Sequence, residues 1–372
     1  TMFRKYLALL QKSDWLLTVA AIFLVAFGLV ASYSIQAANS DSHLLNFKKQ
    51  IIFFVVGLVV LIVLSVVDYR YLRTFSGVLY AVGSLLLVVA LVLGTVIHGT
   101  RGWIYFFGTQ GFQPVELVKV VMVVAVSTLL ARWGGEVGTP RRLLLLTAAA
   151  GTLVGLVLLQ PDFGSAFILF VIFFGLLLLG RLRRSYLVFI TLGLLAVVIT
   201  SWFLVLRPYQ RDRILTFVNP SRDPYGSGYN IKQSIIAVGS GKFFGRGLSL
   251  GPQSRLNFLP AQETDFVFAV VAEELGFLGA GLLIGVIVLL VYRLHRVGQQ
   301  SRDSFGTYLV SGTVIYLAAQ SLLNIGMNVG LVPIAGVPLP LVSYGGSSLI
   351  ASLAMLGIAQ SVQIRQTTSR SP

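Results

Sequence analysis

The sequence lacks cysteine altogether and holds only three histidines, His43, His98 and His295. The absence of cysteine excludes disulfide bonds and thiolate chemistry. The histidines are far apart in the sequence, which argues against a histidine-based metal site. Charged residues are also scarce, at 11% of 372 residues, whereas 56% of the residues are hydrophobic. Because a water-soluble domain does not bury that much apolar surface, the composition predicts a polytopic membrane protein.

Negative charge is the scarcer sign, with 13 Asp and Glu against 28 Lys and Arg and a net charge of +15. An excess of this kind can indicate nucleic-acid binding. In a membrane protein, anionic lipid and the enrichment of cytoplasmic loops in Lys and Arg explain it better. The sequence contains no P-loop, kinase signature or dinucleotide fingerprint, so any reaction would draw its energy from the substrate itself or from an ion gradient.

Long apolar stretches are the dominant feature that is present, and they predict an all-α fold with ten transmembrane helices. The predicted spans are 15–35, 50–67, 77–98, 114–132, 143–159, 162–179, 185–205, 265–292, 305–325 and 344–364. No small-residue cleavage signature follows the first span, so we interpret it as retained rather than as a signal peptide. The short outer loops carry only Lys48, Lys49 and Arg101, and this bias places both termini in the cytoplasm.

One connection, residues 206–264, is much longer than the others and lies on the extracytoplasmic side in this topology. Long loops cross the membrane regardless of charge, so its basic composition is compatible with that side. Within it, residues 229–238 carry apolar side chains at helical spacing and predict a short amphipathic helix. We find no soluble domain and no convincing repeat, so residues 1–372 are interpreted as a single transmembrane domain.

Polar side chains gather at the outer ends of several predicted spans. Glu116 and Lys119 share one helical face and either neutralise each other for packing or hold Lys119 ready for an anionic group. Asp162 and Asp265 each open a span, where a carboxylate either caps the helix or belongs to a site. The serines and glycines of 343–348 allow tight helix packing or close approach of a ligand. Their convergence on one leaflet predicts a polar cavity open to the outside.

Two further carboxylates, Glu273 and Glu274, lie deeper in the eighth span. At a helical rise of about 1.5 Å per residue, Glu273 is expected roughly 12 Å below Asp265. Carboxylates near mid-depth need protonation, water or cationic partners. A purely structural hydrogen-bonding role is an equally good interpretation of this pair.

Seven short motifs carry a specific resemblance. They are 111–119 (GFQPVELVK), 160–165 (QPDFGS), 228–241 (GYNIKQSIIAVGSG), 256–260 (LNFLP), 264–266 (TDF), 273–276 (EELG) and 340–348 (PLVSYGGSS). With these motifs and the ten-span layout, the chain resembles the SEDS family (shape, elongation, division, sporulation), most closely its rod-shape members. It departs from the family pattern at Ala261 and Glu263, where the family often has Glu and His, and at Val115, which replaces a common Ser.

The resemblance implies a peptidoglycan glycosyltransferase that polymerises lipid II at the outer face of the bacterial cytoplasmic membrane. It also implies a class B penicillin-binding protein and other elongation-complex membrane proteins as partners. Asp265 matches the family's essential aspartate, the expected general base, and Glu116 and Lys119 match its acidic–basic pair. A divalent cation (Mg or Mn) could bridge Asp265 and the substrate diphosphate, although the sequence shows no dedicated metal site. The residues that we expect to bind substrate are Arg101, Asp162, Lys232, Gln233, Arg255, Ser343 and Ser347.

Two other functions use the same features. A transporter that flips lipid-linked precursors needs a lipid groove and anion contacts, but it also needs polar access from both sides in turn. The inner halves of the spans offer little polarity, which favours the enzyme. A non-catalytic scaffold for cell-wall enzymes would leave the outer polar residues without a purpose.

Overall fold

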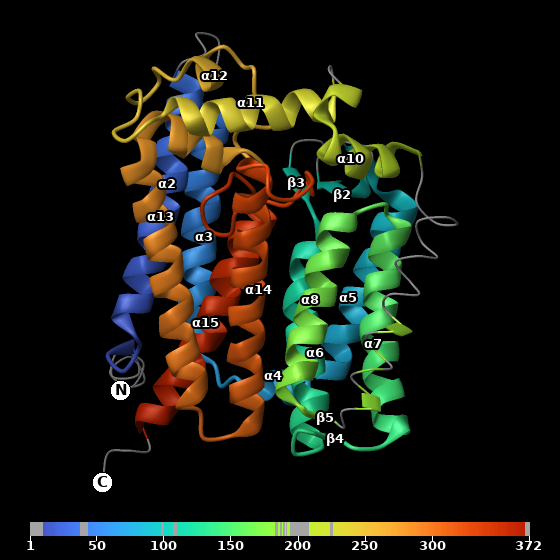
Figure 1. The fold of residues 1–372 in the computed structure, drawn as a ribbon. Coiled ribbons are helices and arrows are strands. Elements are labelled where there is room, and N and C mark those ends of the chain that lie inside the picture. Colours follow the sequence, from blue (N-terminus) through green and yellow to red (C-terminus); the bar gives the residue numbers. More distant parts are fainter. Residues whose placement is uncertain are drawn as a thin grey trace.

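The protein is seen in a computed structural model that describes residues 10–37, 44–97, 100–106, 110–182, 185, 186, 188, 190, 192, 193, 208–223 and 226–368. In this part of the chain the fold is a bundle of long helices standing side by side (Figure 1). Eight of these helices are long and apolar enough to cross a membrane, and α8 is a shorter apolar helix. The all-α fold of a multi-pass membrane protein is therefore confirmed.

Nine of the ten predicted spans correspond to helices in the structure. The helices are α2 (Trp15–Ala37), α3 (Leu45–Val66), α5 (Ser76–Leu93), α6 (Pro114–Arg132), α7 (Pro140–Leu159), α8 (Phe163–Leu179), α13 (Val267–Gln299), α14 (Ser304–Asn328) and α15 (Gly346–Thr368). The predicted seventh span, 185–205, lies largely outside the described residues, so the count of ten stays a prediction. The third span was predicted to run to residue 98. It ends at Leu93 because Gly94 leaves the helical conformation and the next residues form a strand.

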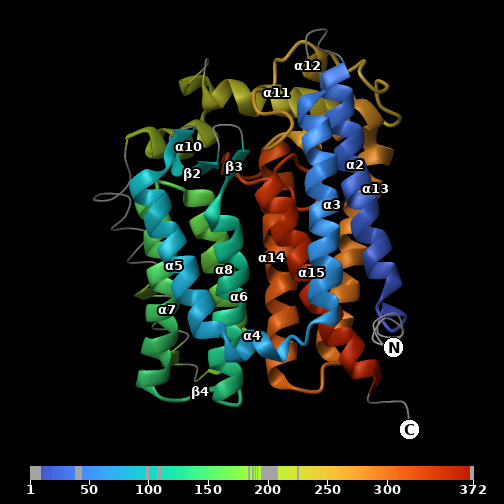
Figure 2. The same cartoon turned by 180° about the vertical axis from the view of Figure 1, so that it is seen from behind.

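The helices form two groups joined by α14. One group contains α2, α3, α13 and α15, and the other contains α5, α6, α7 and α8 (Figures 1 and 2). Helix α14 packs against α13 of the first group and against α6 and α8 of the second. At one end of the bundle the short helix α4 (Arg70–Thr74) links α3 to α5. The central helices α6 and α15 are mostly buried, so polar groups on them must find partners within the protein.

The opposite end, here called the outer end, carries the long loop of the sequence. Helix α11 (Ser227–Ser240) lies across the bundle there, with α10 (Pro208–Val218), the 3₁₀ turn η2 (Pro220–Arg222) and α12 (Pro252–Arg255) (Figure 1). Helix α11 confirms the amphipathic helix predicted at 229–238.

Short strands complete both ends. The strands β1 (Thr95–Ile97), β2 (Thr100–Phe106) and β3 (Gln110–Phe112) form an antiparallel sheet at the outer end. At the inner end β4 (Glu136–Val137) pairs in parallel with β5 (Arg181–Leu182). These strands were not predicted from the sequence; they pair within and between loops and leave the helical class unchanged.

Helix α13 is interrupted at Gly276, which has φ 67° and ψ −164°. Glycine alone adopts this conformation without strain. The loop that follows α11 supplies backbone partners at the break. The amides of Arg246 and Gly247 donate to the carbonyls of Glu273 and Glu274, at 2.9 and 3.0 Å.

This break corrects the predicted eighth span. Residues 277–299 form a helix of about 34 Å at 1.5 Å per residue, long enough to cross a bilayer. The preceding turns, from Val267, lie beneath the outer loop (Figure 1). The sequence did not reveal the break because a single glycine inside an apolar run is common in membrane helices.

The Gly276→Ala variant should be clearly less stable than the parent protein. An added Cβ would lie 2.2 Å from the amide nitrogen of Gly245 and 2.7 Å from the carbonyl oxygen of Phe243. Together with the backbone strain, we expect a loss of about 2 kcal/mol or more, measured by thermal unfolding in detergent. Gly281→Ala is the matched control, because its added Cβ meets nothing within 4 Å. Equal melting temperatures for the two variants would contradict this account of the break.

Candidate functional site

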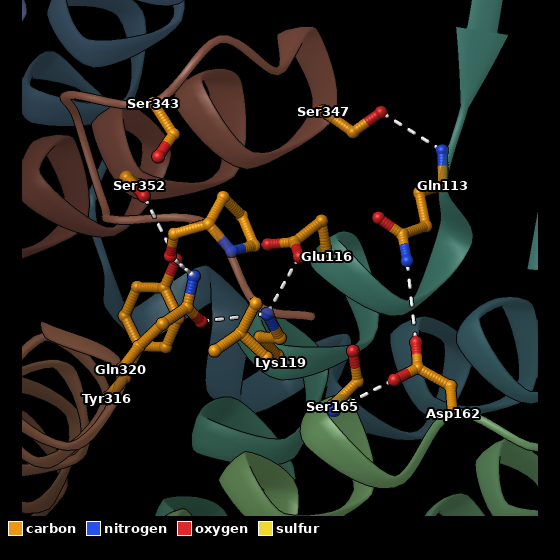
Figure 3. Close-up of polar contacts among 12 residues, drawn as sticks. Gln113, Glu116, Lys119, Asp162, Ser165, Tyr316, Gln320, Ser343, Ser347 and Ser352 are labelled. Carbon is orange, nitrogen blue, oxygen red and sulfur yellow. Dashed lines mark hydrogen bonds and ion pairs between the residues drawn. The ribbon is translucent and has the colours of Figure 1, made fainter. Parts of the chain in front are cut away.

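A buried ion pair lies near the outer end of α6, which begins with Pro114 in its first turn. Lys119 Nζ is 2.7 Å from Glu116 Oε1, and the two side chains are 0% and 2% exposed. The same ammonium donates to Gln320 Oε1 at 2.8 Å and lies 5.7 Å from the ring centre of Tyr316 (Figure 3). These contacts explain how a lysine is tolerated inside the bundle.

The expectation that Lys119 faces an anionic ligand is not met in this conformation. Its ammonium is enclosed by protein and satisfied by Glu116 and Gln320. The second carboxylate oxygen of Glu116, Oε2, is buried and makes no hydrogen bond with the part of the chain described here. The ion pair is therefore connected to the rest of the protein through the side chains that Lys119 contacts, Gln320 and Tyr316.

Asp162 and Ser347 hold neighbouring helix ends together. Asp162 is the N-cap of α8, where its Oδ1 accepts from the Ser165 amide at 3.0 Å. Its Oδ2 accepts from Gln113 Nε2 at 3.4 Å, and the Gln113 amide donates to Ser347 Oγ at 3.0 Å (Figure 3). The capping interpretation of Asp162 is confirmed. Ser347 joins the start of α15 to the start of α6.

Asp265 is not the N-cap residue of α13. Helix α13 begins at Val267, its N-cap Phe266 makes no side-chain cap hydrogen bond, and the Thr264 hydroxyl donates to the Ala261 carbonyl instead. The Asp265 side chain is partly exposed. The interpretation of Asp265 as the residue that caps this span was therefore wrong, and a partly exposed carboxylate lies at the outer end.

The main chain at Asp265 is held by two buried amides of α14. Its carbonyl accepts from Asn324 Nδ2 at 3.0 Å and from Asn328 Nδ2 at 2.9 Å. Its own amide donates to the Ala261 carbonyl at 3.0 Å. Neither asparagine was among the residues predicted from the sequence. The signal was available, because Gln320, Asn324 and Asn328 are polar residues spaced four apart within an apolar span.

The two residues before Asp265 are held in the same way. The Thr264 carbonyl accepts from the Ser343 hydroxyl, and the Glu263 carbonyl accepts from the Tyr344 amide at 2.8 Å. Ser343 is 4% exposed. It was expected to bind substrate, and in this structure it instead supports the segment that carries Asp265.

The Glu263 side chain anchors this segment to the first two spans. Its carboxylate accepts from Gln36 Nε2 at 3.0 Å and from Asn46 Nδ2 at 2.8 Å. Burial raises the pKa of the Glu263 carboxyl, and these two hydrogen bonds oppose that rise. Glu263, which departs from the family pattern, therefore has two hydrogen-bond donors for its carboxylate.

The other predicted substrate-binding residues lie on separate elements of the outer end. Arg101 on β2, Lys232 on α11 and Arg255 at the end of α12 are exposed, and Gln233 on α11 is partly buried. Their side chains are accessible from the outer side, unlike that of Lys119.

Glu273 and Glu274 occupy a different place from the one expected. Glu273 accepts from the amides of Gln253 and Ser254, at 2.8 and 3.0 Å, and Glu274 accepts from the Ser34 hydroxyl at 2.7 Å. The partners of Glu273 belong to the outer loop, so the pair lies at the outer end and not near mid-depth. The break in α13 allows the two carboxylates to lie there. Their hydrogen bonds agree with the structural interpretation of the pair.

An apolar groove of about 410 Å³ runs between α3, α5, α6 and α15. Its wall includes Phe53, Leu79, Val120 and Ile350, with Ser347 at its outer part. A second apolar groove continues from it toward the inner end and shares Leu79 with it. These grooves are apolar, unlike the polar cavity that the sequence predicted.

The fold and these contacts define a multi-pass membrane protein with an apolar groove between its helices and, at its outer end, a partly exposed carboxylate on a hydrogen-bonded main chain. The sequence model of the cell cycle protein family of FtsW, RodA and SpoVE matches residues 14–368. The chain belongs to this family, which is the SEDS family indicated by its motifs.

Individual relatives cover nearly the whole chain. It is 36% identical over 360 residues to the probable peptidoglycan glycosyltransferase FtsW of Coxiella burnetii, covering 93% of this chain and 94% of that protein. It is 36% identical over 310 residues to the peptidoglycan glycosyltransferase MrdB of Escherichia coli, covering 82% of each.

Solved structures share the fold. The rod shape determining protein RodA of Thermus thermophilus superposes with a TM-score of 0.70 at 29% identity, covering 94% of this chain and 96% of that chain. A chain in a structure of a peptidoglycan synthase complex superposes with a TM-score of 0.79 at 31% identity, covering 95% of this chain and 98% of that chain.

Replacing Lys119 by methionine should destabilise the protein strongly. The substitution leaves the Glu116 carboxylate buried without its cation, which typically costs about 3–5 kcal/mol. Unfolding in detergent with a chemical denaturant would measure the loss. The double variant Glu116→Gln with Lys119→Met removes both charges and should recover most of the stability. A single variant as stable as the parent would show that the ion pair is not needed for folding.

Proposed function

We propose that this chain is a peptidoglycan glycosyltransferase that polymerises lipid II at the outer face of the cytoplasmic membrane. Membership of the family and relatives that bear this name support the proposal. The observation that carries it is the placement of Asp265, a partly exposed carboxylate on a main chain held by buried hydrogen bonds at the outer end.

The apolar groove suits the lipid part of such a substrate. A polyprenyl chain is apolar and long, and the two grooves together extend from the outer end to the inner end. The 340–348 motif connects the groove with the carboxylate, because Ser347 lines the groove and Ser343 bonds the residue before Asp265. A lipid tail in the groove would bring its diphosphate and sugars to the outer end.

In this mechanism Asp265 acts as the general base. It accepts the proton of the acceptor sugar's 4-hydroxyl while that oxygen attacks the anomeric carbon of the donor. The bond from the anomeric carbon to the lipid diphosphate breaks, and the electron pair leaves with the diphosphate. We expect the exposed cations Arg101, Lys232 and Arg255 to stabilise that negative charge. Lys119 contributes through its buried partners rather than by direct contact.

A divalent cation would have few protein ligands here. Within the described residues no three His, Cys, Asp or Glu side chains gather in a way that could hold a metal ion. A magnesium or manganese ion at Asp265 would therefore be held mainly by the diphosphate of the substrate, as magnesium often is. We assign no step to it.

A flippase is the second candidate, and the grooves argue against it. Moving a charged headgroup across the bilayer requires polar access from the inner side. The groove toward the inner end is lined mainly by apolar side chains such as Leu64, Val78 and Leu79. This groove suits a lipid tail better than a diphosphate.

The same comparisons support a proposal for the partners and the cellular role. The similar chain in a peptidoglycan synthase complex supports a class B penicillin-binding protein as the partner that crosslinks the new strands. We place the protein in the bacterial cytoplasmic membrane with other elongation-complex proteins. The likeness to a rod shape determining protein supports a role in cell elongation.

The Asp265→Asn variant should lose polymerisation while remaining folded. General-base assistance is typically worth a factor of about 10²–10⁴, so we expect at least about 100-fold less glycan product. Purified protein would be incubated with lipid II and the partner, and strands resolved on a gel. Asp212→Asn, at an exposed position on α10, is the matched control and should be fully active. Near-normal polymer from Asp265→Asn would eliminate Asp265 as the base. Lipid translocation in liposomes without strands from the parent would favour the flippase.

A further inference from the structure

Four polar side chains follow one face of α14. Tyr316, Gln320, Asn324 and Asn328 are spaced four residues apart and are 0% exposed. Residues four apart on a helix lie on the same face, about 6 Å apart along the axis. We refer to Gln320, Asn324 and Asn328 as the amide ladder. Polar side chains buried this deeply in an apolar bundle are stable only when they are hydrogen-bonded.

The inner end of the amide ladder contacts the buried ion pair. Gln320 Oε1 accepts from Lys119 Nζ at 2.8 Å, and Gln320 Nε2 donates to the Pro338 carbonyl at 2.9 Å. A single amide therefore joins α6 to the segment that precedes α15. Tyr316, one turn below, bonds Ser352 of α15 at 2.9 Å (Figure 3).

The outer end of the amide ladder contacts the main chain of Asp265. Asn324 Nδ2 donates to the carbonyls of Val337 and Asp265, at 2.8 and 3.0 Å. Asn328 Nδ2 donates to the same Asp265 carbonyl at 2.9 Å, and Asn328 Oδ1 accepts from the Ala269 amide at 3.1 Å. Both asparagines thus donate to the Asp265 carbonyl. Each also bonds a second backbone group, the Val337 carbonyl for Asn324 and the Ala269 amide for Asn328.

We propose that Asn324 and Asn328 are positioning residues that place the Asp265 carboxylate for proton transfer. The inference rests on the assignment of Asp265 as the base made above. Because both donors come from one rigid helix, they fix the peptide from which the Asp265 side chain projects. Gln320 extends this support to the ion pair of Lys119, which gives the buried lysine a role without contact with substrate.

Positioning of this kind has a measurable size. A displacement of about 1 Å at a reacting group can cost roughly 10²-fold in rate. Loss of one asparagine leaves the other donor on the Asp265 carbonyl, so each single variant should lose about 10- to 100-fold in kcat. The KM for lipid II should change by less than about threefold, because neither asparagine contacts the substrate.

The experiment compares Asn324→Ala and Asn328→Ala with Gln360→Ala in the full-length protein, reconstituted with lipid II and the partner. Gln360 is the matched control. It is a buried amide of α15 that donates to the Asp14 carbonyl at 2.7 Å and to Thr18 Oγ1 at 3.0 Å, far from Asp265. Rates are expressed per folded protein, from the monodisperse fraction.

The pH profile separates positioning from general loss of structure. A displaced base contributes less to the rate, so the fall in kcat at acid pH should become shallower in the two asparagine variants. A merely structural loss scales the whole profile and leaves its shape unchanged, as we expect for Gln360→Ala. Unchanged kcat, or a scaled profile of the parent's shape, in both asparagine variants would overturn the inference.

Two further outcomes are distinguishable. Polymerisation that survives Asp265→Asn would refute the proposed base and this inference with it. Loss in Asp265→Asn with parent-like asparagine variants would refute only the positioning role. Asn324→Leu and Asn328→Leu keep the side-chain size, remove the donor without adding a buried charge, and repeat the test if the alanine variants do not fold. Failure of all four to fold, with Gln360→Ala folded, would assign the amide ladder a purely structural role.

Discussion

Polar groups inside this bundle have no bulk water to bond, and most of the structure around Asp265 follows from that constraint. Lys119 requires an anion and an acceptor, which Glu116 and Gln320 provide. The Nε2 amide group of Gln320 also needs an acceptor, and it donates to the Pro338 carbonyl. Each satisfied group determines the place of the next, so the ion pair, the segment before α15 and the carboxylate segment are positioned together.

The same constraint explains the break in α13. A membrane helix that is interrupted exposes backbone groups, which are costly unless another segment bonds them. The loop after α11 does so, because the amides of Arg246 and Gly247 donate to carbonyls on α13. The Glu273 carboxylate also accepts from the amides of Gln253 and Ser254 in α12. Through these hydrogen bonds the outer loop packs as part of the helical bundle.

Through these two features the outer end is hydrogen-bonded to the bundle, beside an apolar groove. The groove suits a lipid tail, and the outer end offers a partly exposed carboxylate with exposed cations on neighbouring elements. A glycosyltransferase that acts on lipid-linked sugars needs that combination, because its substrate is apolar at one end and charged at the other. In the proposed mechanism, the hydrogen-bonded main chain at Asp265 would supply the geometric precision that proton transfer requires.

The sequence by itself determined the membrane class, nine of the spans and the family motifs, because apolar runs and residue order are local properties. It also paired Glu116 with Lys119, since residues three apart share a helical face. It did not reveal that Lys119 is enclosed, that Ser343 supports Thr264, or that Asn324 and Asn328 bond Asp265. Those contacts join residues about 60 to 200 positions apart in the chain. Only the tertiary structure decides them, because hydrogen bonds between distant segments depend on how helices pack, which no local pattern records.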